Sequence, residues 1–295
     1  MDKKVAIVIL NWNGWQDTQE CLDSLTKITY KNLKIIVVDN GSTDGSPDKL
    51  QPLFPDIRII RNKNNLGFAE GNNIGIAAAL LDSVEYILLL NNDTTVEADF
   101  LSKLILAAEQ ANSALASPKI LFYKDKSKIW FVGGGYYPIL KKTYHQYYRE
   151  EDKGQVSSIK EVDWLSGCCL LVKREVFETI GLLDSDYCFY HEDVDFCARA
   201  QKAGYKLVVA SQSIIYHKFA LSMGGKFSPF CTYFRTRNNL LFFVKTRQWL
   251  PLILNFATFP LYSLLAAVRQ RSWPLARATF MAVFDLLRRN YGFGS

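Results

Sequence analysis

The sequence has 295 residues, a formal net charge of +6 and 49% hydrophobic residues. This size and composition suit one large folded domain with an appendage, and they exclude a low-complexity or collagen-like chain. We find no internal repeat of solenoid length and no signature of a nucleic-acid-binding module, so we expect no nucleic-acid partner.

The positive charge is concentrated at the end of the chain. Residues 226–295 hold ten of the 35 Lys and Arg residues but only one acidic residue, Asp285. A basic and apolar segment of this kind favours contact with an anionic membrane surface. Residues 249–268 carry no charge and are long enough to span a bilayer, but Pro251, Pro260 and the flanking arginines favour helices that lie in the interface. A spanning helix, and an ordinary helical core or dimer contact, are the alternatives.

In the first 120 residues, short apolar runs alternate with amphipathic stretches. The apolar runs predict buried strands at residues 5–10, 33–39, 57–61 and 86–90. The amphipathic stretches predict helices at about 14–27, 45–53, 69–82 and 97–111. This alternation predicts an α/β fold with a Rossmann-like, mainly parallel sheet flanked by helices. The first apolar run is too short for a signal peptide, so we expect it to be a strand.

The pattern is less regular after residue 120. Within residues 121–160, three consecutive glycines at 133–135 are followed by five tyrosines, which predicts an irregular or hairpin region on the acceptor side. Beyond it we expect strands at 162–172, 206–209 and 214–217, and helices at 173–180 and 192–203. The six cysteines form no CxxC pair, so we expect buried free thiols in a reducing compartment.

Two acidic residues follow predicted strands, where ligands of a parallel sheet bind. Asp39 ends the second strand, and its carboxylate can accept the imide N–H of uracil or thymine. Asp93 follows the fourth strand, and its carboxylate can bind a divalent cation together with a diphosphate. For each of them, capping of a turn or of a helix start is the simpler alternative.

Two further candidates lie later in the chain. Glu192, Asp193 and Asp195 fall at a predicted helix start, where acids also complement the helix dipole. One of them can instead deprotonate an acceptor hydroxyl. Asp193 and Asp195 cannot share one helix face, so we expect one to be the base and the other to be structural. His217 ends a strand and is either an ordinary polar residue or a Mn²⁺ ligand.

The order of these segments resembles the family 2 inverting glycosyltransferases of the GT-A fold, especially the bacterial branch of rhamnosyltransferases. The resemblance covers about residues 4–218 and is weaker through the tail. The matching segments are VILNWN at 8–13, VVDNGSTDGS at 37–46, NLGFAEGNN at 65–73, LLNND at 89–93, WLSG at 164–167 through Phe177, FYHEDVD at 189–195, then Gly204, Tyr205 and His217.

The resemblance implies a role for each matching position. Asp193 would be the catalytic base, and Asp93 and His217 would bind Mg²⁺ or Mn²⁺. The nucleotide-binding residues would be Leu10, Trp12, Asp39, Asn65, Gly67, Asn72 and Asn92. The residues on the acceptor and donor-sugar side would be Trp164, Ser166, Gly167 and Glu192. A tail motif common in this branch is matched by Arg235, Arg237 and Asn238.

Two positions depart from the family pattern. Asn91 stands where many members have the first acid of the Asp-x-Asp metal motif, and Asn72 stands where many have an arginine that contacts the donor. The rhamnosyltransferase-like branch often shows such an asparagine in the metal motif. We therefore expect a variant metal site with fewer carboxylates.

The resemblance implies a metal-dependent, inverting enzyme of cell-surface polysaccharide synthesis. Its donor would be a nucleotide-diphosphate sugar, with dTDP-rhamnose favoured, and its acceptor would be a hydroxyl of a glycan or polyprenyl-linked glycan. Residues 1–225 would form the catalytic domain, with a nucleotide-binding half at about 1–95 and an acceptor-binding half at about 96–225. Residues 226–295 would form a helical extension that holds the cytoplasmic enzyme on the inner face of the plasma membrane.

Three other functions are compatible with parts of the sequence. One is a UDP-hexose or UDP-N-acetylhexosamine transferase of the same fold, and another is a non-catalytic scaffold that binds a sugar nucleotide. The third, a sugar-phosphate nucleotidyltransferase, is disfavoured because no Gly-rich loop with basic residues follows the first predicted strand.

Overall fold

The computed structural model describes residues 3–156, 158–219 and 228–291. A ten-stranded sheet forms its centre, with the main order β10-β12-β6-β11-β4-β1-β2-β3. The first four strands pair in parallel, as predicted. They are β1 (Val5–Asn11), β2 (Leu33–Asp39), β3 (Arg58–Arg61) and β4 (Tyr86–Asn91). The strands β1 and β4 are almost fully buried, which explains their continuous apolar sequence.

The other half of the sheet is mixed, so the expected parallel arrangement holds only for the first half. The strand β11 (Cys169–Lys173) pairs antiparallel with both β4 and β6 (Leu115–Phe122). Between β10 and β11, residues 162–168 form no helix. A parallel strand would need such a crossover to return the chain to the other end of the sheet. The strand β12 (Leu207–His217) is parallel to β6, and β10 (Ile159–Glu161) lies antiparallel at the edge.

Several predicted boundaries differ from the observed ones. The predicted strand at 162–172 is shorter, because residues 162–168 cross the end of the sheet before β11 begins. The predicted strands at 206–209 and 214–217 are one strand, with an irregular register between Ala210 and Ile214. The hairpin predicted within 121–160 is present. Its strands β8 (Gly134–Tyr136) and β9 (Thr143–His145) follow the short β7 (Ile129–Phe131).

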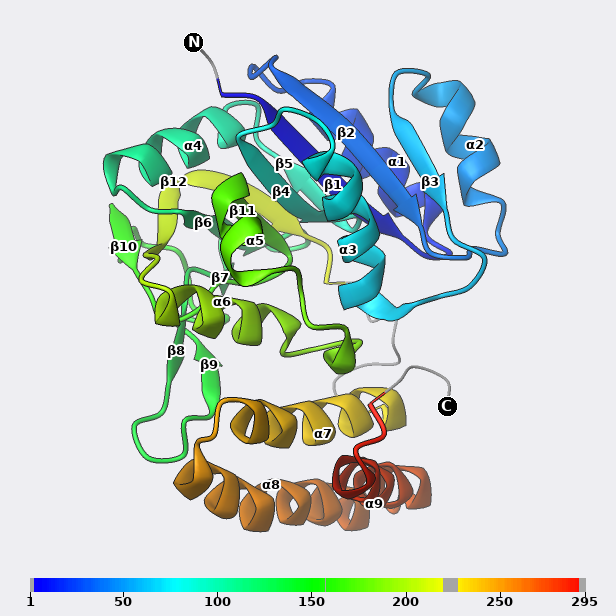
Figure 1. Ribbon diagram of the computed structural model, residues 1–295, viewed down its shortest axis with the longest axis vertical. Coiled ribbons are helices and arrows are strands. Elements are labelled where there is room, and N and C mark those ends of the chain that lie inside the picture. The colour runs from blue at the N-terminus through cyan, green and yellow to red at the C-terminus, as the bar shows by residue number, and fades with distance from the viewer. Residues whose placement is uncertain (1–2, 157, 220–227, 292–295) are drawn as a thin grey trace.

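Six helices cover the two faces of the sheet (Figure 1). They are α1 (Trp15–Leu25), α2 (Ser46–Leu53), α3 (Gly67–Leu80), α4 (Phe100–Gln110), α5 (Arg174–Ile180) and α6 (Glu192–Lys202). The helix α4 begins later than predicted, because β5 (Thr94–Val96) first pairs with β12. The helix α3 lies close to β1, since a Cβ atom on Gly75 would come within 2.3 Å of Val8 Cγ1. All six cysteines are buried and free, as predicted.

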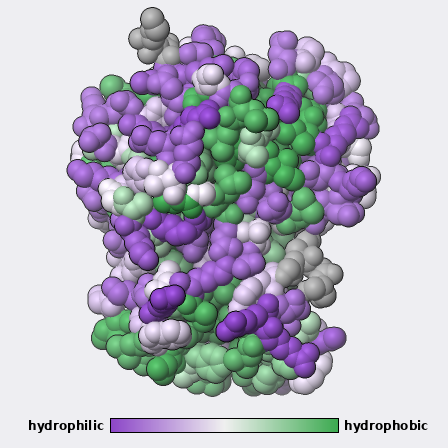
Figure 2. All heavy atoms as spheres, viewed as in Figure 1, coloured by the Kyte–Doolittle hydropathy of each residue, from purple (hydrophilic) through white to green (hydrophobic). Residues whose placement is uncertain are grey.

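Three further helices form a separate layer at one end of the molecule (Figure 1). They are α7 (Pro229–Lys245), α8 (Trp249–Arg269) and α9 (Trp273–Arg288). By length and composition α8 is long and apolar enough to cross a membrane, the one such helix among the described residues. It continues through Pro260, and Figure 2 shows hydrophobic side chains at this end of the molecule. The predicted boundary at 225/226 lies outside the described residues.

Candidate active site

The carboxylate of Asp39 is fixed where β1 and β2 end side by side. The sheet register pairs Asn11 with Asp39. Asn11 Nδ2 donates to Asp39 Oδ1 at 2.8 Å, and the backbone N–H of Ser42 donates to Asp39 Oδ2 at 3.1 Å. Asp39 is only 4% exposed, so it is an oriented acceptor at the edge of the sheet. Trp12 follows Asn11 in the chain and is 47% exposed, and Leu10 is half-buried.

A chain of side-chain hydrogen bonds joins this end of the sheet to the segment after β4. Thr18 Oγ1 donates to Asn11 Oδ1 at 2.8 Å, and Asn92 Nδ2 donates to Thr18 Oγ1 at 3.0 Å. The structure thereby brings Asp39 and Asn92 into one network. Asn11 and Thr18 were not among the predicted site residues, although the position of Asn11 at a strand end was a signal for it.

The predicted residues Asn65 and Gly67 shape a turn. The buried Asn40 donates through Nδ2 to Asn65 Oδ1 at 2.9 Å and to the Gly67 carbonyl at 3.0 Å. Gly67 has a φ of +85°, and a Cβ there would lie 3.1 Å from the Cys188 carbonyl oxygen. The turn therefore packs directly against the segment that precedes α6. Asn40 is a further residue that sequence reasoning missed.

Asn72 does not reach the exposed surface of the site. Its side chain is buried, and its Nδ2 donates to the Phe68 carbonyl within α3 at 2.9 Å. The structure thus places it inside the helix packing, apart from the other predicted nucleotide-binding residues.

Asp93 and His217 meet across the sheet, because β5 pairs with the end of β12. His217 Nε2 lies 3.1 Å from Asp93 Oδ1, and the Lys218 backbone N–H donates to the Asp93 carbonyl at 2.9 Å. The other ring nitrogen of His217, Nδ1, is buried without a hydrogen-bond partner, and Trp130 packs edge-on against the ring at 4.4 Å.

This pair fits a divalent cation that completes its ligand set from a substrate. One carboxylate oxygen and one imidazole nitrogen suit Mn²⁺, and a diphosphate supplies further oxygens. Within the described part of the chain, no group of three or more His, Cys, Asp or Glu side chains is arranged for a metal.

Asp193 lies in the first turn of α6, and both of its carboxylate oxygens are oriented. Gly167 N–H donates to Oδ2 at 2.9 Å, and Val194 N–H donates to Oδ1 at 2.8 Å. The next residue, Cys168, accepts a 2.8 Å hydrogen bond from the Asn91 N–H at the end of β4. Two consecutive residues thus connect Asp193 to the strand that leads into Asp93. Burial raises the pKa of Asp193, and the backbone hydrogen bonds partly oppose this.

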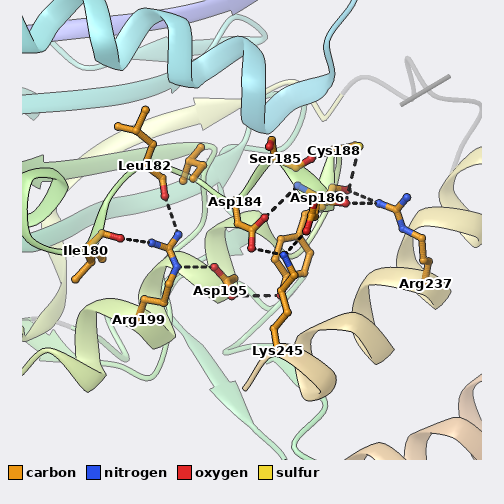
Figure 3. A network of polar contacts seen from close by, with 12 residues as sticks. Ile180, Leu182, Asp184, Ser185, Asp186, Cys188, Asp195, Arg199, Arg237 and Lys245 are labelled. Carbon is orange, nitrogen blue, oxygen red and sulfur yellow. Dashed lines mark hydrogen bonds and ion pairs between the residues drawn. The ribbon is translucent and has the colours of Figure 1, made fainter. Parts of the chain in front are cut away.

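The neighbouring acids have different surroundings. Asp195 is buried and forms a 2.7 Å ion pair with Arg199, and Tyr187 Oη donates to its other oxygen at 3.2 Å (Figure 3). Asp195 is therefore held by side-chain contacts within the fold, whereas the carboxylate of Asp193 accepts from backbone N–H groups. Glu192 is buried with Oε2 unpartnered, and burial together with the charge of Asp193 raises its pKa well above the usual value.

The remaining predicted residues belong to the segment 164–167, which contacts Asp193 through Gly167. Trp164 is buried, and its Nε1 donates to the Gly135 carbonyl at 3.3 Å. Ser166 Oγ accepts from the Cys168 N–H at 3.3 Å, which stabilises the turn that carries Gly167. Of these residues, Gly167 alone makes a hydrogen bond to Asp193 among the described contacts.

The profile of the family described as Glycosyl transferase family 2 matches residues 6–181, which is more than half of the chain. The chain belongs to glycosyl transferase family 2. This glycosyltransferase is 28% identical over 239 residues to the N-acetylglucosaminyl-diphospho-decaprenol L-rhamnosyltransferase of Mycobacterium tuberculosis, covering 74% of this chain and 77% of the relative. It is 26% identical over 309 residues to the dTDP-rhamnosyl transferase RfbF of Shigella flexneri, covering 100% and 99%.

Solved structures agree on the GT-A fold of this glycosyltransferase. The mannosyltransferase PcManGT from Pyrobaculum calidifontis, in complex with GDP-Man and Mn²⁺, aligns with a TM-score of 0.61 at 16% identity and covers 99% of this chain and 82% of its own. GalNAc-T7 with UDP, GalNAc and Mn²⁺ aligns with a TM-score of 0.60 at 15% identity, covering 73% and 43%. At these identities the likeness establishes the fold.

The buried ring of His191 predicts a pH dependence of stability. Burial, with a contribution from the charge of Arg235, lowers the pKa of His191 to about 3. In the unfolded chain the His191 imidazole binds a proton near pH 6.5, whereas in the folded protein it stays neutral down to about pH 3. The contribution of His191 to the unfolding free energy is therefore complete above pH 6.5 and is lost as the pH falls toward 3. Between pH 6.5 and 5 the wild type should lose about 2 kcal/mol more unfolding free energy than His191→Asn. Urea unfolding at several pH values measures this, and equal losses would mean that His191 is solvated in the folded protein.

Proposed function

We propose that the protein is an inverting, metal-dependent rhamnosyltransferase that moves rhamnose from dTDP-rhamnose to a hydroxyl of a glycan or lipid-linked glycan. The observation that carries this proposal is the connection of Asp193 to the end of β4 through Gly167 and Cys168. It holds one carboxylate base close to the segment that bears Asp93.

The donor and acceptor are supported by the relatives. RfbF is named a dTDP-rhamnosyl transferase and matches along the whole chain. The mycobacterial relative is named for rhamnosyl transfer to a decaprenol-linked N-acetylglucosamine. The fixed carboxylate of Asp39 suits the imide N–H of thymine or uracil, so UDP-hexoses and UDP-N-acetylhexosamines are the donors to compare.

In this proposal, one set of residues acts on the leaving group and another acts on the nucleophile. Asp93 and His217 would hold a divalent cation, which would stabilise the negative charge of the departing diphosphate. Asp193 accepts the proton of the attacking hydroxyl, and its raised pKa makes it a stronger base than an ordinary aspartate. The hydrogen bonds from Gly167 and Val194 hold the carboxylate in one orientation. Attack on the face opposite the diphosphate inverts the anomeric centre.

Replacing the base should separate chemistry from binding. Asp193→Asn keeps the shape of the side chain but removes its basicity, so kcat should fall by about 10²–10⁴-fold while nucleotide affinity stays within about threefold. Rates of dTDP release with acceptor, and calorimetric titration of dTDP, measure the two quantities. Asp195→Asn, which breaks the Arg199 ion pair, is the control. It should lower the melting temperature but reduce kcat much less than Asp193→Asn does. A normal kcat in Asp193→Asn would remove Asp193 from the mechanism.

Metal dependence is testable at the Asp93–His217 pair. Chelation with EDTA should abolish transfer, and added Mn²⁺ should restore it. His217→Ala removes the nitrogen ligand, so the Mn²⁺ concentration for half-maximal rate should rise by about tenfold or more. His145→Ala is a matched control, because the His145 ring also packs edge-on against Trp130, while its Nδ1 lies 3.1 Å from the Trp130 carbonyl oxygen. Full activity in EDTA-treated, metal-free enzyme would refute this part of the proposal.

We also infer that α8 and α9 place the enzyme on an anionic membrane surface. Both helices expose large apolar side chains, among them Trp249, Ile253, Trp273 and Phe284. Exposed arginines flank them at positions 247, 269, 271, 277, 288 and 289. The one acid of this region, Asp285, is engaged by Tyr233 at 2.7 Å. An apolar face bordered by cations favours insertion at the level of lipid phosphates.

Vesicle binding tests this surface. The full chain should co-sediment with vesicles that contain phosphatidylglycerol, and less with pure phosphatidylcholine, because the arginines add electrostatic attraction. The triple change Trp249→Ser, Ile253→Ser and Phe284→Ser should release it. Leu81→Ser removes a still more exposed apolar side chain outside α8 and α9 and should have no effect. A wild type that stays in the supernatant with both vesicles would contradict the proposal.

A further inference from the structure

The backbone that leads into α6 has an uncommon conformation. Cys188, Tyr190 and His191 have φ angles of 57°, 67° and 73°. Positive φ is costly for side chains with a Cβ atom, and such residues persist only where their surroundings hold them. No regular secondary structure spans residues 188–191, so their carbonyl groups need partners elsewhere.

Asn238 of α7 supplies many of these partners. Its Nδ2 lies 2.7 Å from the carbonyl oxygens of Tyr187 and Phe189 and 2.8 Å from that of Tyr190. The amide group of Asn238 therefore contacts three backbone carbonyl groups that are 48 to 51 residues away in the chain. Asn238 is fully buried, so water does not compete for these contacts.

Arg237 holds the start of the same segment. Its Nη2 donates to the carbonyl of Asp186 at 2.7 Å (Figure 3) and to that of Tyr187 at 3.1 Å. Its Nε donates to Asn238 Oδ1 at 2.8 Å. The Arg237 side chain is fully buried, and its guanidinium bonds to carbonyl and amide oxygens. The bond to Asn238 Oδ1 also fixes the orientation of the Asn238 amide, so the two residues act as one unit.

The held segment ends at the catalytic base. His191 is the N-cap of α6, and Asp193 is the second residue of that helix. The hydrogen bonds of Asp193 to Gly167 and Val194 require α6 to start in its present place and direction. Releasing the carbonyls of residues 186–190 would let the helix start relax toward ordinary φ angles and move the carboxylate.

We propose that Arg237 and Asn238 are positioning residues that set the orientation of the Asp193 carboxylate for proton removal. This proposal rests on the proposed role of Asp193 as the base. It makes α7 part of the active site, with a role separate from the membrane contact of α8 and α9.

The first test removes the amide donors. Asn238→Ala should lower kcat by about 10–100-fold, because a displacement of about 1 Å in a reacting group has effects of this size. The KM for the donor and the affinity for dTDP should change less than kcat, because the turn at Gly67 is held by the Cys188 carbonyl, which accepts from the Phe68 N–H, and Asn238 bonds to the carbonyls of Tyr187, Phe189 and Tyr190. The control is Asn255→Ala, which removes a buried asparagine of α8 that donates to the carbonyls of Leu140 and Pro251. Its kcat should stay within about twofold of the wild type.

A second pair of variants, both at Arg237, distinguishes an effect on the position of Asp193 from an effect on folding. Arg237→Lys keeps the cation but reaches fewer carbonyls, so it should retain more kcat than Arg237→Met at temperatures where both are folded. The pH profile of the Asn238→Ala variant gives an independent readout, because a displaced Asp193 should show a changed acid limb. A merely structural role would lower the melting temperature and leave this limb in place.

The outcomes are distinguishable from failure of the proposed function. If wild type transfers sugar but Asn238→Ala and Arg237→Met match Asn255→Ala in kcat and pH profile, the positioning role is wrong. If Asn238→Ala does not fold, the Arg237 pair decides the question in the same way. If the wild type transfers no sugar from any nucleotide donor, the proposed function fails.

Discussion

The active site depends on one short connection, in which Gly167 donates to Asp193 and Cys168 accepts from Asn91. Because Gly167 and Cys168 are consecutive, Asp193 and the end of β4 cannot move apart without breaking one of these two hydrogen bonds. Antiparallel β11 makes this possible, since it starts at the edge of the sheet where β4 ends. The insertion of an antiparallel strand is therefore the feature that brings Asp193 to the end of β4.

A second constraint is the satisfaction of buried polar groups. Asn11, Asn40 and Asn238 each connect segments that are more than twenty residues apart. Asparagine suits this task because its amide donates and accepts at once. Leaving such buried groups unpaired costs about 1–3 kcal/mol each, so these networks fix the loops around the site strongly.

The C-terminal helices carry both proposed functions, membrane contact and positioning of Asp193, in one layer. The helix α7 faces the catalytic domain through Arg237 and Asn238, while α8 and α9 expose their apolar side chains. Contact with a membrane would thus occur on the far side of a layer that also holds the segment before Asp193. In the proposed function this arrangement brings the base toward acceptors that are anchored in lipid.

The sequence alone determined the parallel strands of the first half, the helical tail and the family, because periodicity and local motifs are properties of neighbouring residues. It also identified Asp39, Asp93, Asp193 and His217 as candidates, and the structure brings Asp93 to His217. Tertiary structure decided what depends on distant contacts, namely the antiparallel pairing of β11 and the burial of Asn72. The partners of Arg237 and Asn238 lie about fifty residues away. No local pattern encodes such a separation, so only the folded chain shows that the tail motif holds the segment before the base.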